Sequence, residues 1–193
     1  MEYDKAIDIG IKEGAKNYEI ARKIYLCYPA YIFHKKEEVE FEILNKICKK
    51  FKVPYNSLQI VGSSKTGRSY HKENTFKHEE SDLDIAIISK DLFDKFQKEV
   101  YIITNKYSNL SSFPRIRGES VYSNFLAYLA KGMFRPDFMP TCSKKQDWDT
   151  FFNKLSNKYY DLFKNINAMI YSDIYYFESK QARNMQFYRE GTY

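Results

Sequence analysis

Two stretches of the chain carry most of the information about its fold: residues 58–64 read LQIVGSS, and residues 81–88 read SDLDIAII. The run Leu58–Val61 is short, apolar and closed by Gly62, which predicts a buried strand that ends in a tight turn. From Asp82 to Ile88 the residues alternate with a period of two, which predicts a second strand. We therefore expect a sheet that contains both strands.

Helical periodicity surrounds these two strands. Apolar residues that recur every three or four positions predict helices over about residues 3–28, 36–51, 119–131, 146–164 and 172–189. Ser89 is predicted to cap a further helix that runs through Ile103. Residues 166–171 predict a third strand. The expected fold class is α+β, with a small mixed sheet surrounded by many helices.

The composition is that of a folded globular protein. The chain has 193 residues, of which 44% are hydrophobic and 29% charged, and this excludes disordered and fibrous classes. No run approaches the roughly 18 apolar residues of a membrane span. The first ten residues, MEYDKAIDIG, carry acids where a signal peptide would be basic and then apolar, so a cytoplasmic protein is predicted.

The charge balance favours an anionic partner. With 31 Lys and Arg against 25 Asp and Glu the net charge is +6, which suits a polyanionic substrate or partner. The 18 Tyr and 15 Phe provide either core or rings on which bases could stack. Cys27, Cys48 and Cys142 are few and far apart, so we expect reduced cysteines rather than a disulfide framework or a zinc motif.

The two strand ends place polar groups where phosphate chemistry needs them. Residues i and i+2 of a strand share a face, so the carboxylates of Asp82 and Asp84 are expected about 7 Å apart along the chain, where they could share divalent metal ions. A cation would neutralise the repulsion between them. Gly62 allows the backbone to approach a phosphate closely, and its neighbour Ser63 offers a hydroxyl donor.

The region from about Leu58 to Ile88 resembles the DNA polymerase β-like nucleotidyltransferase superfamily. The signature of that superfamily is a hydrophobic strand, Gly-Ser, a spacer, and Asp-x-Asp in the next strand. The resemblance implies a mixed sheet of the nucleotidyltransferase type. It also implies an enzyme in which an acceptor hydroxyl attacks the α-phosphate of a nucleoside triphosphate and pyrophosphate leaves.

The resemblance also implies roles for individual residues. Asp82 and Asp84 would be catalytic ligands of two Mg²⁺ (or Mn²⁺) ions. Gly62, Ser63 and Ser64 would contact the β- and γ-phosphates. The spacer is longer than the commonest family spacing and is expected to be an insertion. Its basic residues either contact triphosphate or a nucleic-acid backbone or are simply solvated, and they are Lys65, Arg68, Lys72 and Lys77.

The superfamily usually has a third metal-binding carboxylate on a later strand. No later predicted strand carries a central acid. Asp137, between the aromatic residues Phe134 and Phe138, is the candidate for this catalytic and metal-binding position. Glu119 and Asp173 are weaker candidates.

The carboxyl terminus suggests a second resemblance. A terminal helix stopped by Gly191 would leave Tyr193 on a short end of the chain. A small nucleotidyltransferase that ends in a tyrosine resembles the nucleotidyltransferase component of Hailong anti-phage defence systems. That resemblance implies that Tyr193 primes short single-stranded DNA in antiviral defence, with a membrane effector protein as partner. The alternative, that Tyr193 is merely the last of the tyrosines, stays open.

The sequence thus predicts one nucleotidyltransferase domain over residues 1–193. It would comprise N-terminal helices (about 1–52), a catalytic core (about 55–140) and a C-terminal helical part (about 141–193). Two other functions remain open: a toxin-type transferase that modifies tRNA or a partner protein, and a catalytically inactive nucleotide-binding protein of the same fold. The base and sugar of the nucleotide, the acceptor and the oligomeric state are left open.

Overall fold

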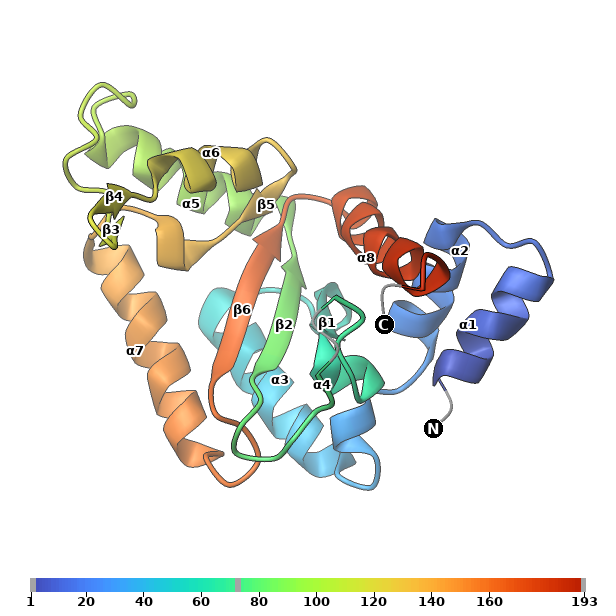
Figure 1. Ribbon diagram of the computed structural model, residues 1–193. Helices are drawn as coiled ribbons and strands as arrows, with labels where there is room; N and C mark the ends of the chain where they lie inside the picture. Colours follow the sequence, from blue (N-terminus) through green and yellow to red (C-terminus); the bar gives the residue numbers. More distant parts are fainter. Residues whose placement is uncertain (1–2, 72–73, 192–193) are drawn as a thin grey trace.

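The computed structural model describes residues 3–71 and 74–191, and over these residues it forms eight α-helices, a four-stranded sheet and a two-stranded hairpin (Figure 1). The elements in chain order are α1 (Tyr3–Lys12), α2 (Asn17–Arg22), the π-helix η1 (Lys23–Cys27), the 3-10 helix η2 (Tyr31–Phe33), α3 (Glu37–Phe51), η3 (Tyr55–Ser57), β1 (Leu58–Val61), α4 (Ser63–Thr66), β2 (Leu83–Ile88), α5 (Lys90–Ile103), β3 (Arg115–Ile116), β4 (Glu119–Ser120), α6 (Tyr122–Leu129), β5 (Met133–Phe134), η4 (Pro136–Phe138), α7 (Ser143–Lys158), β6 (Ile166–Tyr171) and α8 (Ile174–Arg189).

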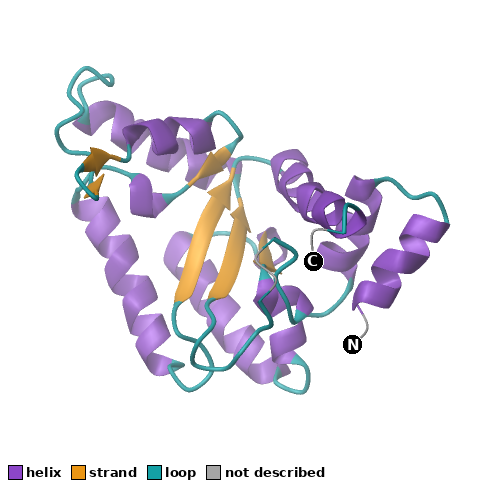
Figure 2. Ribbon diagram, viewed as in Figure 1, coloured by secondary structure: helices purple, strands orange, loops and turns teal. Residues whose placement is uncertain are grey.

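The main sheet has the strand order β1-β2-β6-β5. β1 runs antiparallel to β2, β2 runs parallel to β6, and β5 runs antiparallel to β6. The sheet is therefore mixed and small, and helices surround it (Figure 2). The predicted α+β class is confirmed at this level, as are the strands predicted at residues 58–61 and 166–171.

The two faces of the sheet pack against different helices. Leu83, Ile85 and Ile87 of β2 are at most 1% exposed and belong to a core with α3, α5 and α7. Ala86 of β2 and Tyr171 of β6 point to the other face and belong to a core with α1, α2 and α8. Figure 1 shows α7 and α8 on opposite sides of the strands. Period-two alternation thus divides β2 between two cores.

The turn from β2 into α5 follows the predicted capping pattern. The Ser89 hydroxyl accepts a hydrogen bond from the Leu92 backbone N–H at 3.3 Å, which satisfies one of the free donors at the helix start. Leu92, Phe96 and Val100 form the buried stripe of the helix. The helix is amphipathic because these residues recur every four positions.

The prediction of one helix over residues 3–28 is wrong. α1 ends at Lys12, and Gly14 adopts φ +75°, a conformation that an α-helix does not contain. α2 begins after Lys16, whose backbone N–H donates to the Glu19 carboxylate at 2.7 Å. The apolar spacing continues across this break because both helices bury residues in one core, which hides the turn in the sequence pattern.

The helix predicted over residues 119–131 is shorter than expected. Gly118 has φ +86° and forms the turn of the β3–β4 hairpin, so Glu119 lies in a strand and α6 starts at Tyr122. Strand β5 then follows at Met133–Phe134, where no strand was predicted. The predicted helix at 146–164 runs from Ser143 to Lys158 instead. Two-residue strands are too short to leave a periodic signal.

Candidate active site

Asp82 and Asp84 lie at the start of β2, on the face that the core of α3, α5 and α7 does not cover. In the sheet register Asp84 pairs with Val61 of β1 and with Asn167 of β6. Residues paired in register point to the same face, so Asp84 and Asn167 are neighbours there. Asp82 accepts a hydrogen bond from the Asn165 side-chain amide at 3.0 Å. Two aspartates and two asparagines therefore form a polar corner at one end of the sheet.

The asparagines repeat the pattern of the aspartates. Asn165-Ile166-Asn167 enters β6 alongside Asp82-Leu83-Asp84, with Ile166 opposite Leu83. The strand was predicted, but the amides were not, because only an acid was expected at this place. The sequence feature that could have indicated them is a second polar–apolar–polar triplet at the start of an apolar strand.

Gly62 is required where it stands because Asp84 packs against it. Its backbone has φ +67° and ψ −157°, a region that essentially only glycine occupies. A Cβ at this position would lie 2.8 Å from Asp84 Oδ2, closer than real Cβ contacts. The turn after β1 and the Asp84 carboxylate are thus fitted to one another.

The side chains that follow Gly62 point in different directions. Ser64 is buried, and its hydroxyl donates to the Val61 carbonyl at 2.8 Å, which stabilises the turn itself. Lys65 is 4% exposed, and its ammonium donates to the Tyr28 carbonyl at 2.6 Å. Burial lowers the pKa of Lys65 to about 8, while Glu40 acts in the opposite direction. Ser63, the first residue of α4, is half-buried.

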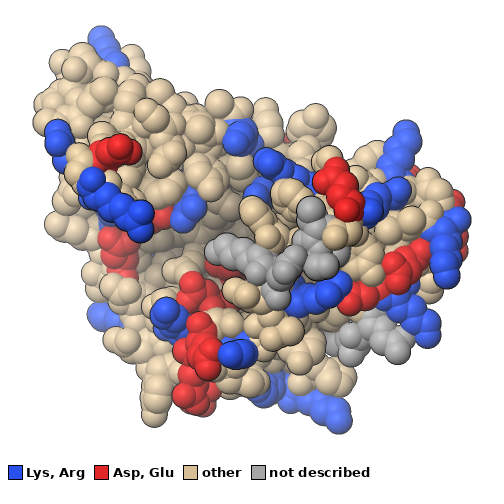
Figure 3. Space-filling model, in the orientation of Figure 1, with Lys and Arg blue, Asp and Glu red and all other residues tan. Residues whose placement is uncertain are grey.

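A cavity of about 580 Å³ opens above the polar corner. Its floor is formed by β2 and β6, one wall by α7 and η4, and the other wall by α8. Figure 3 shows the surface hollowed in this region, in front of the strands of Figure 1. The charged residues that line it are Asp82, Asp84, Asp137, Asp149, Arg135 and Lys180. Acids outnumber bases, so the cavity favours cations.

Asp137 lines this cavity but is engaged with a base. Its carboxylate accepts two hydrogen bonds from the Arg135 guanidinium, at 2.6 and 3.1 Å. Arg135 in turn lies 4.4 Å from the Phe138 ring centroid and donates to the Tyr128 hydroxyl. The acid that sequence reasoning missed is Asp149 of α7, whose pKa is raised chiefly by burial. Any role of Asp137 as a third ligand would require this ion pair to rearrange.

The two weaker candidates for the third carboxylate lie elsewhere. Glu119 is exposed in the β3–β4 hairpin. Asp173 caps α8, and its carboxylate accepts a hydrogen bond from the Tyr175 backbone N–H at 2.7 Å. Neither residue lines the cavity.

The side chains of the polar corner are suitable ligands for a hard cation, although only two of them are acids. Within residues 3–71 and 74–191 no group of three or more His, Cys, Asp or Glu side chains is placed to hold a metal ion. Carboxylate and amide oxygens are nevertheless the ligands that Mg²⁺ accepts, and it retains several waters. Asp82 and Asp84, with Asn167 as an oxygen-bearing neighbour, therefore fit Mg²⁺ or Mn²⁺ better than a soft metal.

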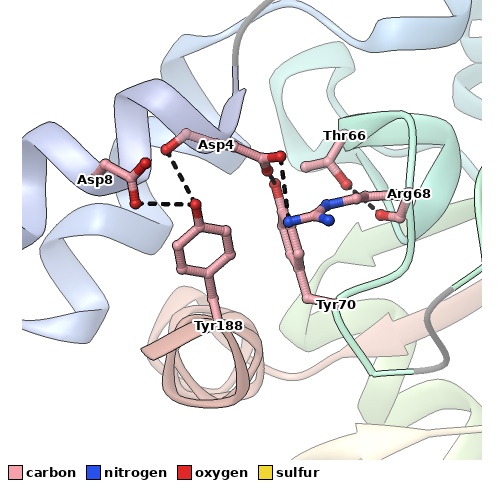
Figure 4. A network of polar contacts seen from close by, with 6 residues as sticks. All are labelled: Asp4, Asp8, Thr66, Arg68, Tyr70 and Tyr188. Atoms are coloured by element: carbon pink, nitrogen blue, oxygen red, sulfur yellow. Dashed lines mark hydrogen bonds and ion pairs between the residues drawn. The ribbon is translucent and has the colours of Figure 1, made fainter. Parts of the chain in front are cut away.

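A polar network links the segment after α4 to helices α1 and α8 (Figure 4). Arg68 forms an ion pair with Asp4 of α1 at 3.2 Å, and the Tyr70 hydroxyl donates to the same carboxylate at 3.1 Å. Tyr188 of α8 donates to Asp8 of α1 at 2.9 Å. Burial and the hydrogen bond to Asp8 raise the pKa of Tyr188 to about 12. The network fixes α8 relative to the turn at Gly62.

The remaining basic residues of the spacer are placed away from the carboxylates or beyond the described chain. Lys77 forms an exposed ion pair with Glu80 at 3.2 Å. Lys72 lies outside the described residues, as does Tyr193. α8 ends at Arg189 and Gly191 follows with φ +66°, which confirms the predicted stop of the terminal helix.

A larger cavity, about 790 Å³, lies between α8 and the loop that joins α1 to α2. Both arginines that line it already have partners: Arg22 makes two hydrogen bonds to Glu178, at 2.7 and 2.8 Å, and Arg189 donates to the Ala15 carbonyl. We therefore regard the smaller cavity, which contains the two aspartates, as the candidate active site.

No protein-family model, curated protein or solved structure matches this chain. Among the described residues, no helix combines the length and the apolar character that crossing a membrane requires.

Proposed function

We propose that this chain is a metal-dependent nucleotidyltransferase with a fold of the DNA polymerase β type. The single observation that carries the proposal is the fit between Gly62 and Asp84: the turn after β1 packs directly against the second aspartate of the Asp-x-Asp pair. A phosphate held at the turn would therefore lie beside the carboxylates. The cavity above them, about 580 Å³, is large enough for a small ligand such as a nucleotide.

The proposed reaction is a displacement at the α-phosphate. An acceptor hydroxyl oxygen bonds to the α-phosphorus, the bond from that phosphorus to the oxygen of the β-phosphate breaks, and pyrophosphate leaves with the electron pair. The hydroxyl proton passes to a cavity carboxylate or to water. The backbone at Gly62 and the Ser63 hydroxyl hold the leaving phosphates, and the cavity walls orient the base and sugar.

Asp82 and Asp84 would hold Mg²⁺ or Mn²⁺. When bound, the metal supplies charge neutralisation at the phosphates and lowers the pKa of the attacking hydroxyl. The hydrogen bond from Asn165 orients the Asp82 carboxylate, and Gly62 limits the positions that Asp84 can take. These contacts pre-organise the ligands before a metal arrives.

The proposal is tested by pyrophosphate release. The protein is incubated with Mg²⁺ or Mn²⁺ and each of the eight common ribo- and deoxyribonucleoside triphosphates. Asp82→Ala and Asp84→Ala are each expected to reduce release by at least about 100-fold. The exposed Asp161→Ala is the matched control and should retain wild-type release. Ser63→Ala should raise KM for the triphosphate with little change in kcat. Release above one per cent in both aspartate variants would refute the assignment.

A second candidate is a nucleotide-binding protein of the same fold that does not transfer. One observation favours it: Asn167 occupies the strand position beside Asp84, and no third acid completes the cluster within the described residues. This candidate predicts metal-dependent binding of a nucleoside triphosphate, measured by calorimetry, without pyrophosphate release from any of the eight substrates.

The acceptor is the finer part of the proposal. By its resemblance to the Hailong component, the chain would add deoxynucleotides to its own Tyr193 and make short single-stranded DNA. Intact-mass spectrometry after incubation with deoxynucleotides and Mg²⁺ should then show a ladder of additions on the protein. Tyr193→Phe should abolish the ladder, and Tyr188→Phe should retain it. Label on tRNA or on a second protein instead would favour the toxin-type transferase.

A further inference from the structure

One face of α8 carries a stripe of basic and aromatic residues. Tyr176, Lys180, Arg183 and Phe187 are spaced four, three and four positions apart, so they lie on one side of the helix. The stripe is about 16 Å long at 1.5 Å per residue. The opposite face of the helix packs into the core through Phe177 and Met185. Core packing therefore does not explain the stripe.

The cations at this stripe lie close to one another. Lys131, in the turn before β5, joins Lys180 and Arg183, and none of the three forms an ion pair with an acid within the described part of the chain. Burial lowers the pKa of Lys180; Tyr128 acts in the opposite direction, and the positive charges of Arg183, Lys131 and Arg135 lower the pKa further. Figure 3 shows Lys and Arg side chains between the places that α6 and α8 occupy in Figure 1.

Rings accompany these cations. Tyr176 is 38% exposed, and its ring packs on the backbone of Gly132, beside Lys131. At the far end of the stripe Phe187 lies 4.9 Å from the His71 ring, and the Arg183 guanidinium lies 5.5 Å from Phe187. Alternation of rings and cations along a groove is typical of surfaces that bind single-stranded nucleic acid, where bases stack and phosphates pair.

The stripe borders the candidate active site at the wall that α8 forms. Lys180 and Asn184 of α8 line the cavity together with the two aspartates. Gly62 follows β1, at one edge of the sheet, and Lys131 precedes β5, at the other edge. Three strand spacings of about 4.8 Å separate these edges, about 14 Å in all. A triphosphate held at the turn therefore leaves Lys131 and the neighbouring Tyr176 to another ligand.

We propose that the surface formed by Lys131, Tyr176, Lys180 and Arg183 binds a single-stranded nucleic acid through its backbone phosphates and stacked bases, and leads the strand end to the aspartates. In naming the strand as acceptor or product, the inference rests on the proposed function. Binding of the strand itself does not require transfer, so the two can be tested separately.

The test measures fluorescence anisotropy of labelled 20-mers of deoxythymidine and uridine, with EDTA present so that no transfer occurs. Lys131→Ala/Lys180→Ala/Arg183→Ala should weaken binding at least about 30-fold and reduce the slope of log affinity against log salt by about 2, since each phosphate contact in a single strand contributes about 0.7. Tyr176→Ala should weaken it about 5-fold or more.

The matched control is Lys49→Ala/Lys95→Ala/Lys98→Ala, which removes the same charge from exposed positions of α3 and α5. It should change affinity less than about 3-fold. Circular dichroism melts verify that both triple variants fold. Equal losses in the two triple variants, or full competition by ATP at its own affinity with no preference for oligomers, would overturn the proposal.

The two proposals fail in different ways. Strand binding that depends on α8 without pyrophosphate release supports this surface and refutes the transferase. Pyrophosphate release with no measurable strand binding supports the transferase and refutes this surface. Comparison of the two labelled oligomers further shows whether the surface prefers DNA or RNA.

Discussion

The two faces of strand β2 have opposite chemistry over a few residues. One face presents Leu83, Ile85 and Ile87, all at most 1% exposed, to a core that three helices close. The other face begins with Asp82 and Asp84 and becomes apolar only where α8 and its neighbours cover it. The first face is explained by burial alone, whereas stability does not explain placing two like charges side by side on the second.

The two faces therefore have different roles: the apolar face stabilises the fold, and the other face exposes polar side chains to the cavity. An apolar side chain in a closed core contributes through area removed from water and through contacts that no other position supplies. A carboxylate at the rim of a cavity contributes little to the core and is repelled by its neighbour. Substitutions on the two faces should therefore move different quantities.

The largest effect is expected when substitutions of two neighbouring residues, on opposite faces of β2, are compared. Ile85→Ala should lower the free energy of unfolding by about 2–5 kcal/mol, because it leaves a cavity in a close-packed core. Asp84→Asn should change that free energy by no more than about 1 kcal/mol, because it keeps the size of the side chain at the rim of a cavity and removes a like charge beside Asp82. Urea denaturation at pH 7 without metal measures both. A loss in Asp84→Asn as large as that in Ile85→Ala would contradict the division between the faces.

Gly62→Ala should disturb the open face alone. The new Cβ combines an unfavourable positive φ with a 2.8 Å approach to Asp84 Oδ2. We expect destabilisation by about 1–3 kcal/mol and, if the chain transfers nucleotides, loss of release together with it. The control is Gly14→Ala, because Gly14 has φ +75° but an added Cβ there would meet no atom within 4 Å. Equal loss of release in both variants would indicate backbone strain rather than displacement of the carboxylate.

The third prediction concerns Lys65, a charged residue that is buried rather than exposed to the cavity. Its pKa is lowered by burial to about 8 from an ordinary value of 10.5, so between these pH values the unfolded chain binds more protons than the folded chain. The free energy of unfolding should therefore rise with pH in this window, by about 2 kcal/mol between pH 7 and 9.5. Lys65→Met should lack this rise.

The comparison of the two proteins isolates the lysine. Tyr3, Tyr70 and Tyr171 have raised pKa values because they are buried, and they reduce stability only as the pH passes the ordinary tyrosine value of 10. These residues are common to wild type and Lys65→Met, so they cancel in the difference between the two unfolding curves. A difference that stays flat from pH 7 to 9.5 would mean that Lys65 remains protonated throughout.

The features of the fold that were predicted correctly are those that depend on residues close together in the sequence. The strands predicted at residues 58–61 and 82–88, the cap at Ser89 and the stop at Gly191 depend on nearby residues, and the structure confirms them, with the second strand beginning at Leu83. The break at Gly14 escaped prediction because the flanking helices share one core and so keep one apolar pattern.

The site was less predictable because its members meet only through sheet pairing. The motif identified Asp82, Asp84 and Gly62, but it could not show that Ser64 and Lys65 turn inward to carbonyl groups of Val61 and Tyr28. Nor could it place Asn167 beside Asp84, since that contact requires the parallel register of β2 and β6 across more than 80 residues of chain. Local spacing indicates which residue types are present, and long-range pairing decides which of them meet.

The smallest effect is expected at Asn167, which the pairing of β2 and β6 places beside Asp84. Asn167→Asp adds a third carboxylate at the register position beside Asp84. Without metal, the added repulsion should lower stability by about 1 kcal/mol, or Tm by about 2–4 °C for a chain of this size. With Mn²⁺, three carboxylates should bind the ion about 10-fold more tightly than two, so the variant should become the more stable protein.

Asn153→Asp provides the control for this prediction, because Asn153 lines the same cavity from α7 and undergoes the same chemical change. Calorimetric titration with Mn²⁺ and thermal melts with and without the ion compare the two variants. If the affinity gain comes from position in the sheet, only Asn167→Asp should show the crossover from less stable without Mn²⁺ to more stable with it. A similar gain in Asn153→Asp would show that any added negative charge in the cavity suffices, and the open face of the sheet would then be an acidic surface rather than a built metal site.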